Sequence, residues 1–376
     1  MTVEIREVAK TRRELKKSVK FRIDNYKGND CYVPPLIFDE VNTLRPKGNP
    51  AFDFCEAQTW MAYRDNKPVG TITGIINHVA NQRTGVETVR FGFVDFIDDD
   101  EVVDALFKTV EDWGRAHGCT EIVGPLGFTD MDPEGMLIEG FDRLSTQATI
   151  YNHPYYPTHM ERMGFEKDAD WVEFRVTTGD KVPDRYVRIA EIVAKRYDLR
   201  VVKYTSRKKL KADYGQEIFQ LINKAFDNLY GYTPLTDRQI QHYISMYLGI
   251  LRLELVTLIV DKNDKLVAVG ITIQSFSRDF QKCRGRIFPF GWVHILRGLY
   301  GKNDVVDLML IAVDPEYQGK GVNAMLFNDL VRIYIKNGYK WAETNVELET
   351  NAKVQAQWEY FDYEQHRRRR SFRKGL

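Results

Sequence analysis

A strand that runs into a glycine turn and then a helix is the most chemically informative segment of the sequence. Residues Leu310–Val313 form an apolar run, Asp314–Gly321 form the turn, and a helical apolar repeat begins at Val322. The first backbone N–H groups of a helix have no partner within it, and the helix dipole favours an anion there. Glycines at 319 and 321 carry no side chain that would block close approach. The segment therefore predicts a binding turn for a pyrophosphate.

Two other nucleotide-binding turns are excluded, because the segment lacks GxGxxG after an early strand and also lacks GxxxxGK[ST]. It resembles the GNAT superfamily of acyl-CoA N-acyltransferases, whose signature is Gln or Arg, two residues, Gly, one residue, then Gly or Ala. Gln318 and Gly321 match this signature, whereas Asn323 replaces its last small residue. An ordinary glycine-rich helix start is the alternative. The resemblance implies that acetyl-CoA or a longer acyl-CoA is bound as a substrate by Ile311, Ala312, Val313, Gln318, Gly319, Lys320, Gly321, Val322 and Asn323.

A later segment resembles the same family with two departures. The family usually has Asn, then Tyr seven residues on, then a Gly-Phe pair. Asn351 matches, Trp358 replaces the Tyr, and Asp362-Tyr363 replaces Gly-Phe. The resemblance implies that Asn351 and Trp358 lie in the acyl-CoA site.

Acyl transfer from a thioester to an amine requires a base for the amine proton and hydrogen-bond donors for the carbonyl oxygen. The resemblance implies that backbone N–H groups at 311–313 polarise the carbonyl and that a carboxylate, often through water, removes the proton. We favour Glu347 as the base, with Glu343 and Glu349 as alternatives on or just after the same predicted strand. Three acidic residues in seven positions are, however, more often a solvated strand face.

The thiolate that leaves usually receives a proton from the family's tyrosine. Trp358 stands at that position, and its indole is a hydrogen-bond donor but not a useful acid. Tyr360 and Tyr363 lie nearby, and Tyr360 is the candidate that we carry forward. Both residues also suit a packing role, which is common for half-buried tyrosines.

One order of elements occurs twice, which indicates two similar α/β halves. Each half has a predicted hairpin, a further strand, a helix that ends at a glycine, and another strand. A predicted helix at Asp180–Asp198 joins the halves, so we place the boundary at residue 180. The first half has Thr59–Arg64, Val69–Ile76, Val89–Phe96, Asp98–His117 and Thr120–Pro125; the second has Leu255–Val260, Leu266–Ile273, Val305–Val313, a helix that Gly338 ends, and Lys340–Val346.

The first half lacks the glycine turn. Its corresponding residues, Asp98–Glu101, suit a helix N-cap but would repel a phosphate. Its end, Asn152–Tyr156 and Met160–Phe165, resembles the last helix and Gly-Phe turn of a GNAT domain. The chain thus resembles the tandem GNAT proteins of bacteria. This implies an α/β (α+β) fold of two GNAT-like domains, each a mixed, mostly antiparallel sheet flanked by helices: a degenerate domain at 1–180 and an acyl-CoA domain at 181–376.

The second half carries about 20 extra residues between its hairpin and its helix. The segment Phe280–Tyr300 is rich in large apolar residues interleaved with arginines. We expect Phe288, Phe290 and Trp292 to line a channel for a long acyl chain or a lipid amine, and packing against the first half is the alternative. Part of this segment resembles bacterial ceramide synthases, as do two earlier segments. The three are Arg286–Gly291, Tyr32–Leu36 and Pro46–Phe52.

Two further groups could contact ligands. Tyr155 and Tyr156, beside His153 and His159, are candidates for the acceptor site, although a loop held by hydrogen bonds explains them too. The run Arg367–Arg370 suits either a phosphate or membrane contact or, as the default, an exposed edge strand protected by charge.

Composition limits the class of protein. The 376 residues carry a formal net charge of +1, which argues against a nucleic-acid binder. The four cysteines form no CxxC pair, so neither a metal site nor a disulfide framework is expected. We find no signal peptide and no apolar run long enough for a membrane span, which favours a cytoplasmic protein, at most peripheral at the inner membrane.

The sequence leaves three functions open. The favoured one is transfer of an acetyl or longer acyl group to the amine of a small molecule or lipid. A peptide or aminoacyl transferase of cell-wall precursors is the rival enzyme, and a coenzyme A sensor without turnover is the alternative outside enzymes. The sequence does not indicate the oligomeric state.

Overall fold

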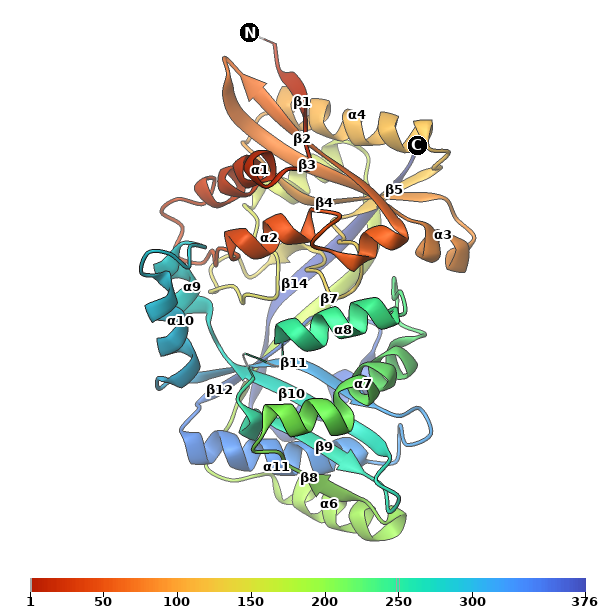
Figure 1. Cartoon of the computed structure of the whole chain (residues 1–376), viewed down its shortest axis with the longest axis vertical. Helices are drawn as coiled ribbons and strands as arrows, with labels where there is room; N and C mark the ends of the chain where they lie inside the picture. Colours follow the sequence, from red (N-terminus) through yellow and green to blue (C-terminus); the bar gives the residue numbers. More distant parts are fainter. Residues whose placement is uncertain (1, 248, 250) are drawn as a thin grey trace. The chain divides into compact units, whose positions relative to one another are not determined.

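The structure is a computed structural model that describes residues 2–247, 249 and 251–376 (Figure 1). The chain forms two compact units. Unit 1 contains Met1–Val172, Phe276–Ile295 and His366–Leu376, and unit 2 contains Glu173–Ser275 and Leu296–Gln365. The predicted domain boundary at residue 180 refers to the sequence repeat rather than to these units, and it stays a prediction.

Unit 1 is built on a mixed sheet in the order β1-β2-β3-β4-β5-β14-β7. Adjacent strands from β1 to β4 are antiparallel, β4 and β5 are parallel, and β14 is antiparallel to β5. The short strand β6 (Met136–Glu139) pairs with β14 outside this order. The strands are β1 (Glu4–Val8), β2 (Cys55–Arg64), β3 (Lys67–Asn77), β4 (Thr88–Phe96), β5 (Glu121–Gly124), β7 (Glu166–Thr177) and β14 (Tyr363–Gly375).

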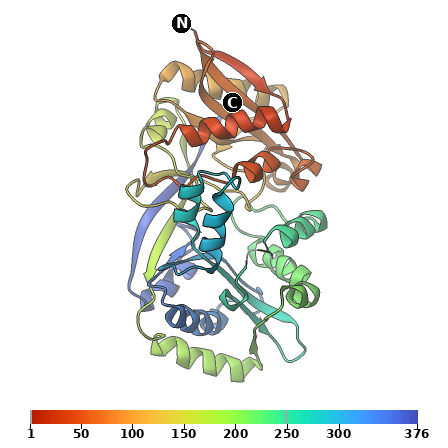
Figure 2. The same cartoon turned by 60° about the vertical axis from the view of Figure 1, so that its left-hand side comes forward.

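Helices cover both faces of this sheet because successive strand residues point to opposite sides. Trp60 and Ile72 pack with α4 (Asp100–Ala116) and α5 (Tyr155–Arg162), whereas Met61 and Ile75 pack with α1 (Arg12–Asp24) and α2 (Ile37–Thr43). Figure 2 shows α1, in red, lying across its face of the sheet. A short helix, α3 (His78–Thr84), follows β3.

The sheet of unit 2 contains the end of β7 and has the order β7-β12-β11-β10-β9-β8. Strands β11 and β12 are parallel, and the other adjacent pairs in this order are antiparallel. The strands are β8 (Arg200–Val202), β9 (Val256–Val260), β10 (Leu266–Gln274), β11 (Val305–Val313), β12 (Trp341–Thr344) and β13 (Glu347–Leu348), the last of which pairs with β7.

Two pairs of helices pack on this second sheet. The helices α6 (Asp184–Tyr197) and α11 (Val322–Asn337) share a core with β9 and β10. The helix α7 (Arg207–Phe226) contacts β10 and β11 and also packs against α8 (Asp237–Tyr247). A short helix, α12 (Ala352–Gln355), precedes β14.

The structure confirms the predicted repeat of hairpin, strand, helix and strand. A glycine at the same point of each hairpin shows its physical basis. A Cβ on Gly70 would lie 2.6 Å from Leu106 Cδ1 of α4, and a Cβ on Gly270 would lie 3.0 Å from Leu330 Cδ1 of α11. In both halves, therefore, the missing side chain lets the long helix approach the sheet.

The expectation of an exposed edge strand at Arg367–Arg370 is wrong. These residues belong to β14, which lies between β5 and β7 in the sheet order. Arg367 and Arg369 are fully buried, and Arg368 and Arg370 both pair with the buried carboxylate of Asp170. These arginines therefore lie in an interior strand of the sheet, and their charges do not protect an exposed edge.

The extra segment of the second half folds into α9 (Ser277–Cys283) and α10 (Gly291–Tyr300). Residues 276–295 of this segment belong to unit 1. The alternative expectation for this segment was that it packs against the first half.

Candidate active site

The predicted pyrophosphate turn has the backbone that its glycines require. Gly319 and Gly321 have φ angles of 74° and 81°, in the left-handed region that side chains disfavour. Within the turn, the N–H groups of Tyr317, Gln318 and Lys320 bond to carbonyl oxygens. In the described part of the chain, no partner is found for the N–H groups of Gly319, Gly321, Val322 and Asn323, which are the donors that an anion would use.

A buried carboxylate fixes the start of this turn. Asp314 accepts hydrogen bonds from the Lys224 ammonium at 2.9 Å and from the Glu316 N–H at 3.0 Å. Burial by itself would raise the pKa of Asp314, but Lys224 and the Glu316 N–H hold this pKa below its ordinary value. Gln318 braces the other side, because its Nε2 donates to the Val313 carbonyl at 3.1 Å. The signature glutamine thus orders the turn.

The two glycines differ in their surroundings. A Cβ on Gly321 would lie 3.0 Å from Ile189 Cγ2 of α6, whereas a Cβ on Gly319 would meet nothing within 4 Å. The side chain of Lys320, between them, lies over the rings of Tyr197 and Tyr317 at 5.3 and 5.2 Å. Gly319 therefore faces open space.

The strand before the turn has one open edge. The parallel pairing of β11 with β12 extends from Val305 to Leu308. Its register with β10 then shifts at Met309, and Asn345 ends the contact by bonding to the carbonyls of Leu308 and Met309. Among the described residues, 310–313 pair only with β10. Because alternate N–H groups of a strand point to opposite edges, some of these donors face the open side.

A carboxylate and an indole meet at the end of this sheet. Trp358 Nε1 lies 3.1 Å from Glu347 Oε1 and 3.3 Å from Oε2. Trp358 is 2% exposed and packs against Phe327 of α11. Burial raises the pKa of Glu347 to about 8, although the hydrogen bond from Trp358 lowers it. A carboxyl group with this pKa is mostly protonated at pH 7, and its base form, which a general base requires, increases as the pH approaches 8.

The other predicted acids and bases have partners. Glu343 on β12 lies 3.9 Å from Arg175 Nε, and Arg175 also covers the Trp341 ring at 4.2 Å. Tyr360 stacks beneath the Arg185 guanidinium at 4.2 Å. Asn351 precedes α12, and its backbone carbonyl accepts from Val354 and Gln355. Roles for these residues in catalysis or cofactor binding stay predictions.

The first half replaces the turn with an acidic cap, as the sequence predicts. Asp99 accepts from the Val102 N–H at 3.1 Å and pairs with Arg64 at 2.6 Å. Tyr155 and Tyr156 bond within unit 1: Tyr155 donates to the Phe96 carbonyl at 2.7 Å and Tyr156 to Asp95 at 2.8 Å. An acceptor contact by these tyrosines stays a prediction that these bonds do not support.

The buried carboxylate of Asp95 escaped sequence reasoning. It also bonds to Tyr26, and Arg22 lies 3.0 Å away. An aspartate between Val94 and Phe96 in an apolar strand was the available signal.

The three aromatic residues expected to line an acyl channel are exposed instead of enclosed: Phe288, Phe290 and Trp292. Phe288 and Phe290 border a large open cavity of unit 1. A role for the three in binding a substrate stays a prediction. In the described residues, no group of three or more His, Cys, Asp or Glu is arranged to hold a metal ion. No described helix is long and apolar enough to cross a membrane.

Comparison with known proteins shows similarity to one family. Residues 216–361 match the family model described as "Acetyltransferase (GNAT) family". Protein YghO of Escherichia coli is 26% identical over 369 residues, which is 96% of this chain and 93% of that protein. A bacterial ceramide synthase of Caulobacter vibrioides is 27% identical over 293 residues, 76% of this chain and 74% of that protein.

Solved structures agree on the fold. A tandem GNAT protein from the clavulanic acid biosynthesis pathway superimposes with a TM-score of 0.56 at 12% identity, covering 99% of this chain and 98% of its own. The fold is that of a tandem GNAT protein, and the glycine turn lies within the part of the chain that matches the GNAT family. The family match and the relatives together support an N-acyltransferase.

Proposed function

We propose that this enzyme transfers an acyl group from acyl-CoA to the amine of a lipid or small molecule, at a single site in unit 2. The observation that carries the proposal is the Glu347 carboxyl group, whose pKa of about 8 suits proton removal from an amine. The unpaired N–H groups at 319 and 321–323 supply the site for the coenzyme A pyrophosphate.

The chemistry assigns one step to each part of this site. Glu347, directly or through water, accepts a proton from the ammonium of the acceptor. The neutral amine then attacks the thioester carbonyl, and a backbone N–H on the open edge of β11 stabilises the negative charge on its oxygen. Collapse of the tetrahedral intermediate forms the amide, expels the thiolate and frees the second proton of the nitrogen, which replaces the proton that Tyr360 gives to the thiolate. Trp358 is hydrogen-bonded to Glu347 and supplies no proton, so Tyr360 is the proposed donor to the thiolate.

The class of acceptor comes from the relatives. A ceramide is the amide of a fatty acid and a long-chain amino alcohol, and one relative is named a bacterial ceramide synthase. We therefore propose a long-chain acyl-CoA as donor and a lipid amine as the preferred acceptor. Such substrates reside in or near membranes, which favours a cytoplasmic enzyme peripheral to the inner membrane.

The test is a thiol-release assay with acetyl-, octanoyl- and palmitoyl-CoA, each combined with a long-chain amino alcohol and with a short amine. We expect the fastest release with palmitoyl-CoA and the long-chain amino alcohol. Equal rates for all donors would leave a short-chain acetyltransferase. Binding of acyl-CoA without release in any combination would favour the sensor.

A further inference from the structure

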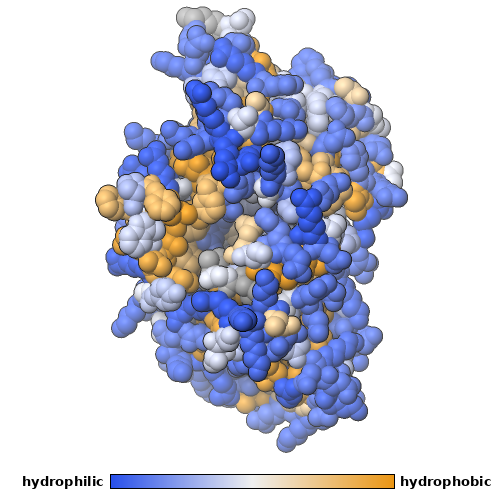
Figure 3. Space-filling view, in the orientation of Figure 1, coloured by the Kyte–Doolittle hydropathy of each residue, from blue (hydrophilic) through white to orange (hydrophobic). Residues whose placement is uncertain are grey.

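Large apolar side chains project from one surface of unit 1. They lie at the tip of the loop between α9 and α10 and on the first turn of α10. Phe288 is 78% exposed, Phe290 74%, and Trp292 and Val293 46% each. Figure 3 shows hydrophobic residues gathered where Figure 1 places these two helices. We call these four residues the apolar tip. Contiguous exposed apolar side chains on a soluble surface mark an interaction site.

The base of this loop is held firmly. Gln281 Nε2 donates to the carbonyls of Asp30 at 2.8 Å and Tyr32 at 3.0 Å, and the Ile37 N–H donates to the Gly285 carbonyl at 2.9 Å. Gly285 has a φ of 69°, and a Cβ there would lie 2.4 Å from the Pro35 carbonyl oxygen. The tip is therefore presented outward by an anchored segment.

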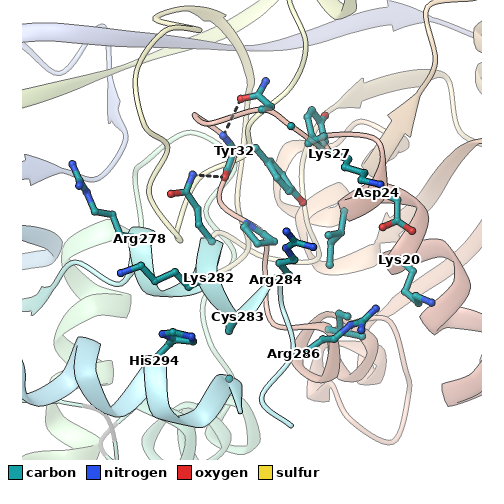
Figure 4. Close-up of a pocket in the computed structure, with 18 of the residues that line it drawn as sticks. Lys20, Asp24, Lys27, Tyr32, Arg278, Lys282, Cys283, Arg284, Arg286 and His294 are labelled. Carbon is teal, nitrogen blue, oxygen red and sulfur yellow. Dashed lines mark hydrogen bonds between the residues drawn. The ribbon is translucent and has the colours of Figure 1, made fainter. Parts of the chain in front are cut away.

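Cations surround an open cavity beside the tip. The cavity has a volume of about 1230 Å³, and Phe288 and Phe290 form part of its lining. Figure 4 shows the charged side chains that line it, from α1, α9 and the loops that follow these helices, together with His294 of α10. Asp24 and Asp30 also line it. Its lysine and arginine residues are Lys20, Lys27, Arg278, Lys282, Arg284 and Arg286.

These six cations outnumber the two carboxylates, and each side chain is exposed. None of the six forms an ion pair with another residue of the described chain. Most of the other arginines of unit 1 differ in this respect: Arg22, Arg64 and Arg370, for example, each pair with a carboxylate. The positive charge around the cavity is therefore available to an external anion.

We infer that the apolar tip and these six cations bind unit 1 to the surface of an anionic lipid bilayer. Apolar and aromatic side chains enter the boundary between headgroups and acyl chains, while lysines and arginines contact lipid phosphates. Trp292 suits this boundary through its apolar ring, while its N–H group donates to the Pro289 carbonyl at 3.0 Å and fixes the ring on the loop. A soluble phosphate would use the cations but would leave four large apolar side chains in water. This inference does not depend on acyl-transfer chemistry, since it concerns unit 1 alone.

The test is co-sedimentation of the full chain with vesicles of phosphatidylcholine, with and without phosphatidylglycerol, in the absence of acyl-CoA. We expect binding to the anionic vesicles, which added salt weakens, and little binding to the neutral ones. Arg284→Gln/Arg286→Gln should weaken binding by about 25-fold, because each cation near an anionic surface contributes about fivefold. Phe288→Ser/Phe290→Ser should weaken it by about tenfold or more.

Matched controls alter the same kinds of residue elsewhere. Arg12→Gln/Lys16→Gln removes two exposed cations of α1 outside the cavity, and Val86→Ser/Ile192→Ser removes two exposed apolar side chains. Both should bind like wild type, and melting temperatures show that all variants are folded. Absence of vesicle binding, or equal losses in the control variants, would overturn the inference. Binding abolished equally by inorganic phosphate at matched ionic strength would show a phosphate site instead.

Discussion

The indole of Trp358 donates a hydrogen bond to the carboxyl group of Glu347 at 3.1 Å, in unit 2. Where the GNAT family usually has a tyrosine, this chain has an indole that donates its hydrogen bond to the proposed base. The pair combines a buried carboxyl, whose pKa is about 8, with one donor that stabilises its charged form.

Replacement of the base should separate turnover from binding. Glu347→Gln keeps an oxygen for the Trp358 indole, so the site should stay folded and acyl-CoA affinity should change little. Turnover should fall by about 10²-fold or more, the usual effect of losing a general base. Steady-state kinetics and calorimetry measure the two quantities. The matched control, Glu349→Gln, should retain activity; unaltered turnover in Glu347→Gln would transfer the role to Glu343, Glu349 or the first half.

The rate should depend on pH in a defined direction. Only the charged form of Glu347 accepts a proton, so kcat/KM should rise as pH increases toward about 8 and level off above it. Trp358→Phe removes the hydrogen bond that lowers this pKa, and the midpoint of the profile should therefore move to higher pH. A profile in Trp358→Phe that coincides with that of wild type would show that another group titrates.

The same pKa predicts how stability changes with pH. The folded protein holds the Glu347 proton up to about pH 8, whereas the unfolded chain releases it near 4.5. Between these values the folded state binds more protons, so this group makes the free energy of unfolding decrease as pH rises. Glu347→Gln should remove that part of the decrease. Urea unfolding of wild type and variant at pH 5 and pH 9 measures the change in the free energy of unfolding between the two pH values. An equal change in both proteins would contradict a buried carboxyl group at Glu347.

Charge at the glycine turn should abolish coenzyme A binding. Gly319 faces open space at a φ of 74°, so Gly319→Glu and Gly319→Gln suffer similar backbone strain and differ mainly in charge. Calorimetry should show one site per chain in wild type, weak binding in Gly319→Gln and much weaker binding in Gly319→Glu. Gly321→Glu should abolish binding.

The first half supplies the control for that experiment. Asp99→Ala should leave binding unchanged, although loss of the helix cap costs about 1 kcal/mol of stability. Two equivalent sites per chain, or equal affinities in the two Gly319 variants, would contradict the assignment.

Local pattern predicts the elements of this fold well but not their long-range pairing. Hairpins, the long helices and the acidic cap at Asp99 follow from alternation, helical spacing and capping residues. The place of β14 does not, because four consecutive arginines suggest solvent until Asp170, some 200 residues away, is seen to pair with two of them.

The candidate site shows the same limit. Its glycine turn can be predicted because the backbone geometry requires glycine, and the sequence narrows the proposed base to three glutamates. Which glutamate is buried beside Trp358 depends on how the chain after β12 turns back, and spacing alone does not encode that. Phe288, Phe290 and Trp292 were likewise expected to line a channel, because composition shows that a segment is apolar but not which side of the molecule it faces.

The most direct test of the account is to measure both products when palmitoyl-CoA and a long-chain amino alcohol are incubated with the protein. Free thiol is determined by colorimetry and the amide by mass spectrometry. Acyl transfer with Glu347 as the base predicts equal amounts of coenzyme A and N-palmitoyl amide, with both reduced about 10²-fold in Glu347→Gln. Thiol release without amide, or amide formation unaffected by Glu347→Gln, would contradict it.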